Sequence, residues 1–424
     1  MTRLQIAENK YALTMAAIMA SLPLQGANSA DLALKKPSNV EYMKACPTYG
    51  AGFFVVPGTT SCLRIIGRVR VEYMFDSPAA RGNDYNRIRT RGYFGWDHRT
   101  PTEYGLLRTN MRAYIQRDNA GTAALPYSPV VDFAFIQFAG FTIGRTTPLF
   151  ENSFIRFFSR SGQYLGALGS DVTYANTVGY THSFGSGFSG SISLEDSSQR
   201  RAGIRLGPGV ALSPNQTTIL GGQAVPDITV ALEAQQSWGQ AKVAGALHQV
   251  RGTFVGAAPA RAVSEEYGYA FTTALKLELP FLAKGSNVWA SFQYAQGAPF
   301  YTHDNAANGD VASRRLAVAD ATVDANGQLF LSRSWSVGGA VEHFITPTIV
   351  ASVGGFYGIF DARGGNNTAA NLAIVGHLSW RPVSGFIIGG EAVYRTISNR
   401  GTTQLGTGTD NADALGRVRF QRDF

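Results

Sequence analysis

The sequence is poor in several features on which other protein classes depend. Charged residues make up 16% of its 424 positions, against roughly 25% in an ordinary soluble domain. Two cysteines are too few for a disulfide-rich scaffold. The six histidines are scattered and never form the H-E-x-x-H spacing of a metal site, so we expect no metal and no cofactor. After residue 30 no run approaches roughly 18 uninterrupted apolar residues, so the sequence predicts no transmembrane helix.

The residues that are present favour strands in a membrane. Hydrophobic residues make up 45% of the chain and aromatic residues 12%, and there are 48 glycines. This content is too apolar for a disordered chain, and with so little charge it is typical of a β-protein of the membrane. The net charge of +8 raises nucleic-acid binding as an alternative. Because the basic residues alternate with apolar ones instead of forming a patch, we do not expect a nucleic-acid partner.

The first thirty residues have the pattern of an export signal. Arg3 and Lys10 precede the apolar stretch 11–24, and small residues follow it. This pattern predicts a signal peptide over 1–29, with a buried N-terminal helix as the alternative.

The two cysteines lie in the segment that follows the predicted signal, an N-terminal extension over 30–61. In an exported chain, Cys46 and Cys62 most simply form one disulfide. Two free thiols are the alternative. Neither version indicates redox catalysis, because the spacing is not C-x-x-C.

Period-two alternation recurs along the rest of the chain and predicts strands. In 267–279 the odd positions are almost all aromatic or aliphatic, and the even positions are small or polar. Segments of this kind suit transmembrane strands, which need roughly 9–11 residues. We predict about sixteen antiparallel strands that close into a barrel over 62–424. They are 62–75, 87–97, 104–117, 130–138, 140–147, 172–183, 188–196, 226–236, 240–251, 265–278, 286–296, 327–343, 346–360, 370–382, 385–398 and 411–424.

The connections distinguish a barrel from a soluble β-sandwich, which alternates too. Long and short connections alternate along the chain. This alternation is typical of an outer-membrane barrel with long loops at one rim and short turns at the other. The predicted long connections are 76–86, 118–129, 148–171, 197–225, 252–264, 297–326, 361–369 and 399–410. In the last strand Phe420 and Phe424 share one face, as expected for a strand that seals against the first. Arg422 falls on that face too, where it can reach the membrane interface.

Arginines dominate the basic residues and cluster in the first three predicted strands. They make up 30 of the 37 basic residues, and the eight named below share one parity within each strand. At the bilayer midplane an arginine facing lipid costs roughly 2–4 kcal/mol, so we expect them to face a water-filled lumen, with a structural ion-pair ladder as the alternative. We call this cluster the basic wall. Its predicted members are Arg64, Arg68, Arg70, Arg87, Arg89, Arg91, Arg108 and Arg112.

The predicted connection 148–171 is too apolar for a loop in solvent, so we expect this third loop to fold into the lumen. Its carboxylates are Glu151 and Asp171, and Arg156 and Arg160 lie between them. Acids that face the basic wall across a constriction would select solutes by charge. Alternatively, Arg156 and Arg160 only hold the loop against the wall.

The chain resembles the general outer-membrane porins of alphaproteobacteria, of the Rhizobiales type. The resemblance covers essentially the whole mature sequence. It is most specific in 40–64, with its two cysteines, in 132–138 (DFAFIQF) and in 418–424 (VRFQRDF). It is weakest in 197–225 and 297–326. It implies a homotrimer of sixteen-stranded barrels in the bacterial outer membrane, surrounded by lipid and lipopolysaccharide and inserted by the barrel-assembly machinery.

The function expected from these features is passive diffusion of ions and small hydrophilic solutes. The excess of basic residues makes the expected channel weakly anion-leaning. A substrate-specific porin with a saturable site is the alternative. An enzyme is not expected, because nothing near His248 or His377, both predicted to face the lumen, indicates a catalytic partner.

Overall fold

The computed structural model describes residues 43–76, 86–118, 128–152, 157–158, 174–208, 210, 218–255, 261–303, 316, 318–364, 367–400 and 411–424. The segment Ala45–Phe424 forms one unit, and the fold given below is that of this unit. The predicted signal peptide over 1–29 lies outside the described residues, as does the first part of the extension. No helix in the described part of the chain is long and apolar enough to cross a membrane.

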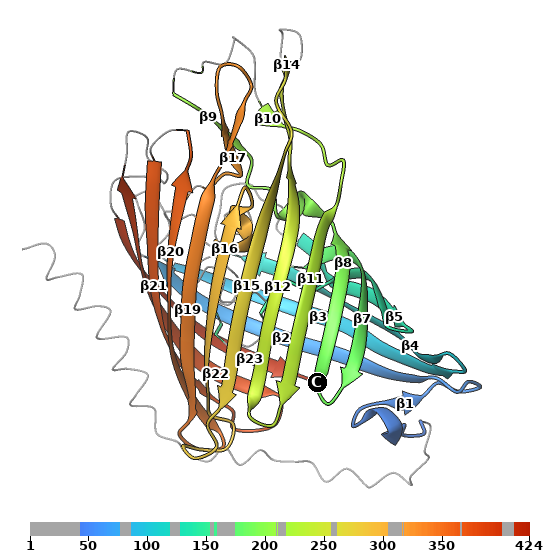
Figure 1. The fold of residues 1–424 in the computed structure, drawn as a ribbon. Helices are drawn as coiled ribbons and strands as arrows, with labels where there is room; N and C mark the ends of the chain where they lie inside the picture. Colours follow the sequence, from blue (N-terminus) through green and yellow to red (C-terminus); the bar gives the residue numbers. More distant parts are fainter. Residues whose placement is uncertain are drawn as a thin grey trace, which may run out of the picture. The chain divides into compact units, whose positions relative to one another are not determined.

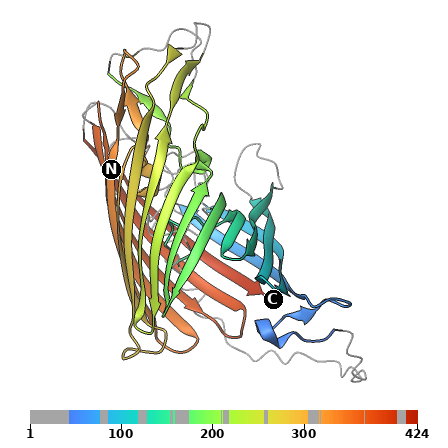
Figure 2. The ribbon, with the colours of Figure 1, turned by 45° about the vertical axis from the view of Figure 1, so that its right-hand side comes forward.

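Sixteen antiparallel strands form a closed barrel, as predicted (Figure 1, Figure 2). Each strand pairs with the next barrel strand along the chain, and the last pairs with the first. The strands are β2 (Cys62–Asp76), β3 (Asn86–Thr102), β4 (Gly105–Asp118), β5 (Ser128–Phe138), β6 (Phe141–Thr146), β7 (Ala175–Gly185), β8 (Phe188–Glu195), β11 (Asp227–Gln236), β12 (Gly239–Val250), β15 (Glu266–Glu278), β16 (Asn287–Gln296), β19 (Arg333–Phe344), β20 (Ile349–Ala362), β21 (Asn367–Trp380), β22 (Phe386–Arg400) and β23 (Asn411–Asp423).

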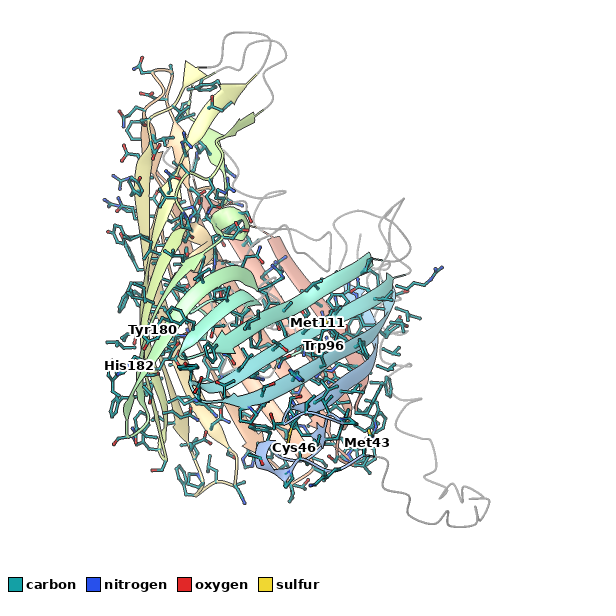
Figure 3. All side chains as sticks on the ribbon, turned by 90° about the vertical axis from the view of Figure 1, so that its right-hand side faces the viewer. Met43, Cys46, Trp96, Met111, Tyr180 and His182 are labelled. Carbon is teal, nitrogen blue, oxygen red and sulfur yellow. A yellow bond between two sulfur atoms is a disulfide. The ribbon has the colours of Figure 1, made fainter. Side chains whose placement is uncertain are left out.

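The two faces of each strand differ in the way that the alternation predicts. In β2, Ile65 and Val69 are about half exposed on the outer face, whereas Arg70 and Glu72 are buried on the inner face. The outer face of β7 carries Tyr180 and His182, which stand on the outside of the wall (Figure 3). The barrel therefore presents apolar side chains outward and polar side chains to its lumen.

The connections divide the barrel into a short-turn rim and a long-connector rim. The short turns are 103–104, 139–140, 186–187, 237–238, 279–286, 345–348 and 381–385. Ala139 and Gly140 both have positive φ, as do Ser186 and Gly187; two-residue hairpin turns of this kind match the twist of the strands. The predicted long connection 361–369 is shorter than expected. β20 ends at Ala362 and β21 begins at Asn367, because the alternation of both strands extends further than we assigned.

Three connections at the long-connector rim form small sheets of their own (Figure 1). The strands β9 (Ile204–Leu206), β17 (Ala321–Val323) and β18 (Leu329–Leu331) make one sheet. The other contains β10 (Thr218–Leu220), β13 (Gly252–Val255) and β14 (Arg261–Ala262). Strands of two to four residues are too short to show a period in the sequence. Our prediction treats these segments as loops, except that it places β18 together with β19 in the single strand 327–343.

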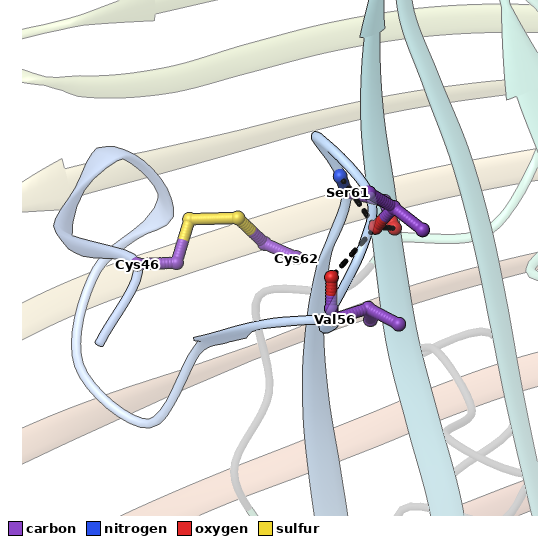
Figure 4. The surroundings of a disulfide bond; sticks show 5 residues. Cys46, Val56, Ser61 and Cys62 are labelled. Atoms are coloured by element: carbon purple, nitrogen blue, oxygen red, sulfur yellow. Dashed lines mark hydrogen bonds between the residues drawn. A yellow bond between two sulfur atoms is a disulfide. The ribbon is translucent and has the colours of Figure 1, made fainter. Parts of the chain in front are cut away.

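The disulfide between Cys46 and Cys62 is present, as predicted (Figure 4). It closes a segment that also contains β1 (Phe54–Val55), which pairs antiparallel with the start of β2. In the chain-entropy picture a closed loop of this size stabilises the fold by roughly 3 kcal/mol. The disulfide therefore fixes residues 46–61 beside the first barrel strand.

The seam between β23 and β2 is closed by backbone hydrogen bonds and by aromatic rings. Phe424 and Gly67 exchange two backbone hydrogen bonds, of 3.0 and 2.9 Å. The Phe424 ring covers Gly67 so closely that a Cβ there would lie 2.1 Å from it. Arg422, on the same outer face, reaches the short-turn rim and donates to the carbonyl of Ser384. Aromatic cover of a strand glycine is a recognised way to strengthen a sheet.

We predict that Gly67→Ala destabilises the barrel, because the new methyl group displaces the Phe424 ring. The expected cost is about 1 kcal/mol, measured as a lower temperature at which the folded band converts to the unfolded band in detergent electrophoresis. Gly92→Ala is the control: Gly92 lies opposite Val69 on the outer face, and a Cβ there meets no atom within 4 Å. Equal conversion temperatures for the two variants would contradict this account of the seam.

The connection between β16 and β19 is anchored inside the barrel by a buried histidine. His303 lies between the inward-facing rings of Phe356 and Phe360, at centroid distances of 6.1 and 6.4 Å. Its Nδ1 is 2.9 Å from Thr302 Oγ1. Burial disfavours the charged ring and lowers the pKa of His303 to about 3. The ring therefore stays neutral in the folded connection at all pH values above that.

We predict that acid loosens this connection. Between about pH 3 and the ordinary histidine pKa of 6.5, the released segment binds a proton that the packed segment does not. Packing is therefore fully favourable above pH 6.5 and weakens as the pH falls, by roughly 2 kcal/mol at pH 5. Hydrogen exchange of 297–303, corrected for intrinsic rates, should accelerate from pH 7 to pH 5. His303→Asn, which cannot titrate, should remove that pH dependence; an unchanged dependence in the variant would refute the role of His303.

Candidate functional site

All eight predicted arginines of the basic wall lie on the inner face of β2, β3 and β4. They share the parity of the buried Glu72 and Tyr93, opposite the exposed Ile65 and Ile88. The register brings the strands' arginines together: Arg70 lies directly opposite Arg91. The structure thus assembles the predicted residues on one wall of the lumen.

The wall is larger than predicted. Arg99 extends it toward the short-turn rim, and Arg395, Arg417 and Arg419 extend it across β22 and β23. Arg417 and Arg419 share parity with Gln421, so the alternation rule could have identified them. We missed them because we considered only the arginines of the first three strands and did not apply the predicted closure, which makes β23 a neighbour of β2.

The tier nearest the short-turn rim surrounds one buried carboxylate. Arg108 donates two hydrogen bonds to Asp97, of 2.9 and 3.0 Å. Arg99 makes two more, and an Nη atom of Arg64 lies 3.8 Å from the same carboxylate. The Asp97 side chain is fully buried. One negative charge therefore holds three guanidinium groups in place and leaves the tier positive.

The middle tier contains Arg68, Arg70, Arg91 and Arg112. Arg68 pairs with Asp423 of β23. Arg112 pairs with Asp132 of β5, its Nε 2.7 Å from the carboxylate. A bulge in β5 turns both Asp132 and Phe133 inward. Arg70 donates from Nε to the amide oxygen of Gln421 at 2.9 Å, and Arg91 donates to Gln116.

The tier nearest the long-connector rim centres on Glu72. Its carboxylate accepts hydrogen bonds from Arg417 at 3.2 Å and from Arg419 at 2.8 Å. Over the described side chains of β22, β23 and β2–β5, twelve inward-facing arginines meet five inward-facing carboxylates. The carboxylates are Glu72, Asp97, Asp132, Glu391 and Asp423. Over these described side chains the wall therefore carries an excess of positive charge.

The connection between β6 and β7 contacts the inner face of the other walls through its described residues, 147–152 and 157–158. Phe150 packs on inward-facing alanines of β11, β12 and β15. Phe157 packs on Trp289 and Phe356. The Phe158 amide donates to Glu391 at 2.6 Å, and its carbonyl accepts from Arg417 and Arg419. These contacts fix the connection to β22 and β23 as well as to β11–β16.

Glu151, predicted to face the basic wall, is engaged elsewhere. Its carboxylate is 2.7 Å from an Nη atom of Arg200, in the connection between β8 and β11. Its main-chain carbonyl accepts from Lys242 of β12 at 2.8 Å. Arg156, Arg160 and Asp171 lie outside the described residues. The pairing with Arg200 joins two loops that are about 50 residues apart, which spacing in the sequence does not reveal.

His248 and His377 have acidic partners that the sequence did not indicate. His248 Nδ1 lies 2.8 Å from a carboxylate oxygen of Asp227, and Asp320 faces its other nitrogen at 3.8 Å. His377 is 3.5 Å from Glu391 and packs against the Phe158 ring. These partners come from other strands and connections. Their contacts join a connection to the inner face of the barrel wall, because Tyr301, from the connection that also contains His303, donates to Asp227 at 2.6 Å.

A metal site is not indicated by these groups. Across the described ranges, no cluster of three or more His, Cys, Asp or Glu side chains is arranged to hold a metal ion.

Sequence comparison relates the chain to porins over nearly all of its length. A family model described as "Porin subfamily" matches residues 31–416. Porin Omp2b of Brucella suis is 25% identical over 446 residues, which cover 98% of this chain and all of that protein. Porin Omp2b of Brucella abortus (strain 2308) is 30% identical over 219 residues, covering 46% of this chain and 56% of the relative.

Solved structures with the same fold are outer-membrane channels. The channel DcaP of Acinetobacter baumannii superimposes with a TM-score of 0.63 at 13% identity, covering 88% of this chain and 99% of DcaP. OmpF of Salmonella typhi, in complex with daunomycin, gives a TM-score of 0.55 at 11% identity, covering 87% and 99%. The family match over residues 31–416 shows that the chain belongs to the porin family, and the fold agrees: it is a channel of the bacterial outer membrane.

Proposed function

We propose that this porin is a passive diffusion channel for ions and small hydrophilic solutes, that it has no enzymatic activity, and that it conducts anions somewhat better than cations. The observation that carries the proposal is the basic wall. Among its described side chains, twelve arginines meet five carboxylates, and the low-dielectric barrel around them focuses the field in the lumen. Anions are therefore concentrated along the wall and cations are depleted there.

We propose that the connection between β6 and β7 narrows the lumen opposite the basic wall. The contacts of Phe150 and Phe158 with opposite parts of the inner face support this arrangement. In particular, the Phe158 backbone uses both its amide and its carbonyl to bind charged side chains of the wall. A connection held in this way leaves the path for ions and solutes on the side of the lumen that is lined by Arg68, Arg91 and Arg112.

We propose a homotrimer as the assembled form. A structure of similar fold, OmpT of Vibrio cholerae, is described as a trimer and superimposes with a TM-score of 0.53 at 11% identity, covering 86% of this chain and all of OmpT. The barrel's apolar outer face would contact neighbouring subunits, outer-membrane lipid and lipopolysaccharide, after insertion by the barrel-assembly machinery.

A substrate-specific porin is the second candidate, and the three arginines around Asp97 favour it. Guanidinium groups held at fixed positions can bind one class of anion. Current recordings in planar bilayers distinguish the two functions. A general channel gives a current that rises linearly with solute concentration, whereas a specific channel gives a current that saturates with its solute.

We predict that Arg68→Ser, Arg91→Ser and Arg112→Ser in combination shift the reversal potential toward cations. Removing three positive charges from the narrow part should lower the anion-to-cation permeability ratio by roughly twofold or more. Measurement of the reversal potential under a potassium chloride gradient tests this.

The control is Arg422→Ser, which removes a charge from the outer face. The control should leave selectivity close to that of the unmodified channel. If the triple variant keeps the original reversal potential, the basic wall does not line the conducting path.

A further inference from the structure

We propose that Tyr93 determines the ion specificity of this channel, although it carries no charge. Its ring holds the middle tier of the basic wall, Arg68, Arg70, Arg91 and Arg112, in one arrangement. The inference rests on the proposed anion selectivity and identifies the residue that positions the charges responsible for it.

Tyr93 occupies the centre of the wall. It lies on the inner face of β3, opposite Arg68 of β2 and Tyr114 of β4, and its side chain is 7% exposed. Neighbouring strands therefore enclose the ring on two sides. A side chain enclosed in this way has one arrangement, and the groups packed on it share that order.

Four guanidinium groups from three strands contact this one ring. The Cζ atoms of Arg68, Arg70 and Arg112 lie 5.4, 5.4 and 5.5 Å from its centroid, within the roughly 6 Å over which an aromatic ring attracts a cation. Arg91 approaches the hydroxyl, donating from Nη1 at 3.2 Å. Its Cζ also lies 4.6 Å from the ring of Tyr114.

The ring counteracts two effects that would scatter these arginines. Guanidinium groups crowded into one region repel each other, and each long side chain loses rotamer entropy when it is fixed. Attraction to the negative face of the Tyr93 ring offsets part of both costs. The side chains of Arg68 and Arg112 remain 23% and 19% exposed, so the ordered charges still face the lumen.

The tier around Asp97 is ordered differently, because one carboxylate holds its arginines through hydrogen bonds. In the middle tier two carboxylates pair with Arg68 and Arg112, and the Tyr93 side chain contacts all four arginines. An aromatic ring orders guanidinium groups without cancelling their charge, whereas each carboxylate removes one positive charge from the field. The Tyr93 ring therefore adds order to the middle tier without weakening its field.

The test replaces the ring without changing any charge. Tyr93→Leu removes the aromatic face, and Tyr93→Phe keeps the face but removes the hydroxyl. We expect Tyr93→Leu to lower the anion-to-cation permeability ratio by roughly twofold and Tyr93→Phe to retain most of it. Both are measured as reversal potentials of the full-length channel in a potassium chloride gradient.

A matched control is available in the preceding strand. Tyr73 of β2 lies on the outer face and is 40% exposed, so Tyr73→Leu makes the same substitution outside the lumen. It should leave the reversal potential unchanged. Because Tyr93→Leu could fail to fold, Tyr93→Met provides a second ring-free variant of greater flexibility, and detergent electrophoresis confirms that each variant is folded.

The outcomes separate this inference from the proposed function. A shift in the ring-free variants but not in Tyr93→Phe or Tyr73→Leu supports the positioning role. An unchanged potential in a folded ring-free variant overturns it, while a shift in the triple arginine variant shows that anion selectivity stands. If neither the ring-free variants nor the triple arginine variant shifts the potential, both proposals fail.

Discussion

Every feature of this channel depends on pairing the backbone groups of a sheet that has no water beside its outer face. In hydrocarbon an unpaired N–H or C=O costs several kcal/mol, so the sheet must close. Closure here depends on the last strand, whose Phe424 exchanges backbone hydrogen bonds with Gly67. Since the side chains of a strand alternate, a closed sheet sends one half of them to lipid and the other half to the lumen. The sequence therefore has to place apolar residues toward lipid and polar residues toward the lumen at alternate positions.

Closure also decides where charge can accumulate. An arginine that faces lipid at the bilayer midplane is costly, and the inward-facing arginines of five neighbouring strands, β22, β23 and β2–β4, meet on one inner wall. Because β23 is joined to β2, Arg417 and Arg419 meet Glu72 across the seam. The same wall then binds the backbone of Phe158. The basic wall is thus also an attachment site for the connection between β6 and β7.

The sequence predicted those parts that follow from local alternation. Sixteen strands and the inward placement of eight arginines follow from period-two parity alone. The same parity rule would have placed Arg417 and Arg419 on the basic wall if we had applied the predicted closure to the last strand. Parity could not reveal contacts that depend on loop folding. Two such contacts join segments that are distant in the sequence. They are the pairing of Glu151 with Arg200 and the pairing of His248 with Asp227 and Asp320. Short strands such as β9 and β17, which pair with each other across two connections, have no periodic signal either.

The central claim is that inward-facing residues of the basic wall line the conducting path, and adjacent residues of β4 test it most directly. Arg112 faces the lumen, and Met111 points outward beside Trp96, its register partner (Figure 3). The described cysteines are both in the disulfide, so a cysteine introduced at either position can be labelled with a charged thiol reagent during current recording. The account predicts that an anionic reagent lowers the current through Arg112→Cys and leaves that through Met111→Cys unchanged. Equal responses, or a response at position 111 alone, would contradict it.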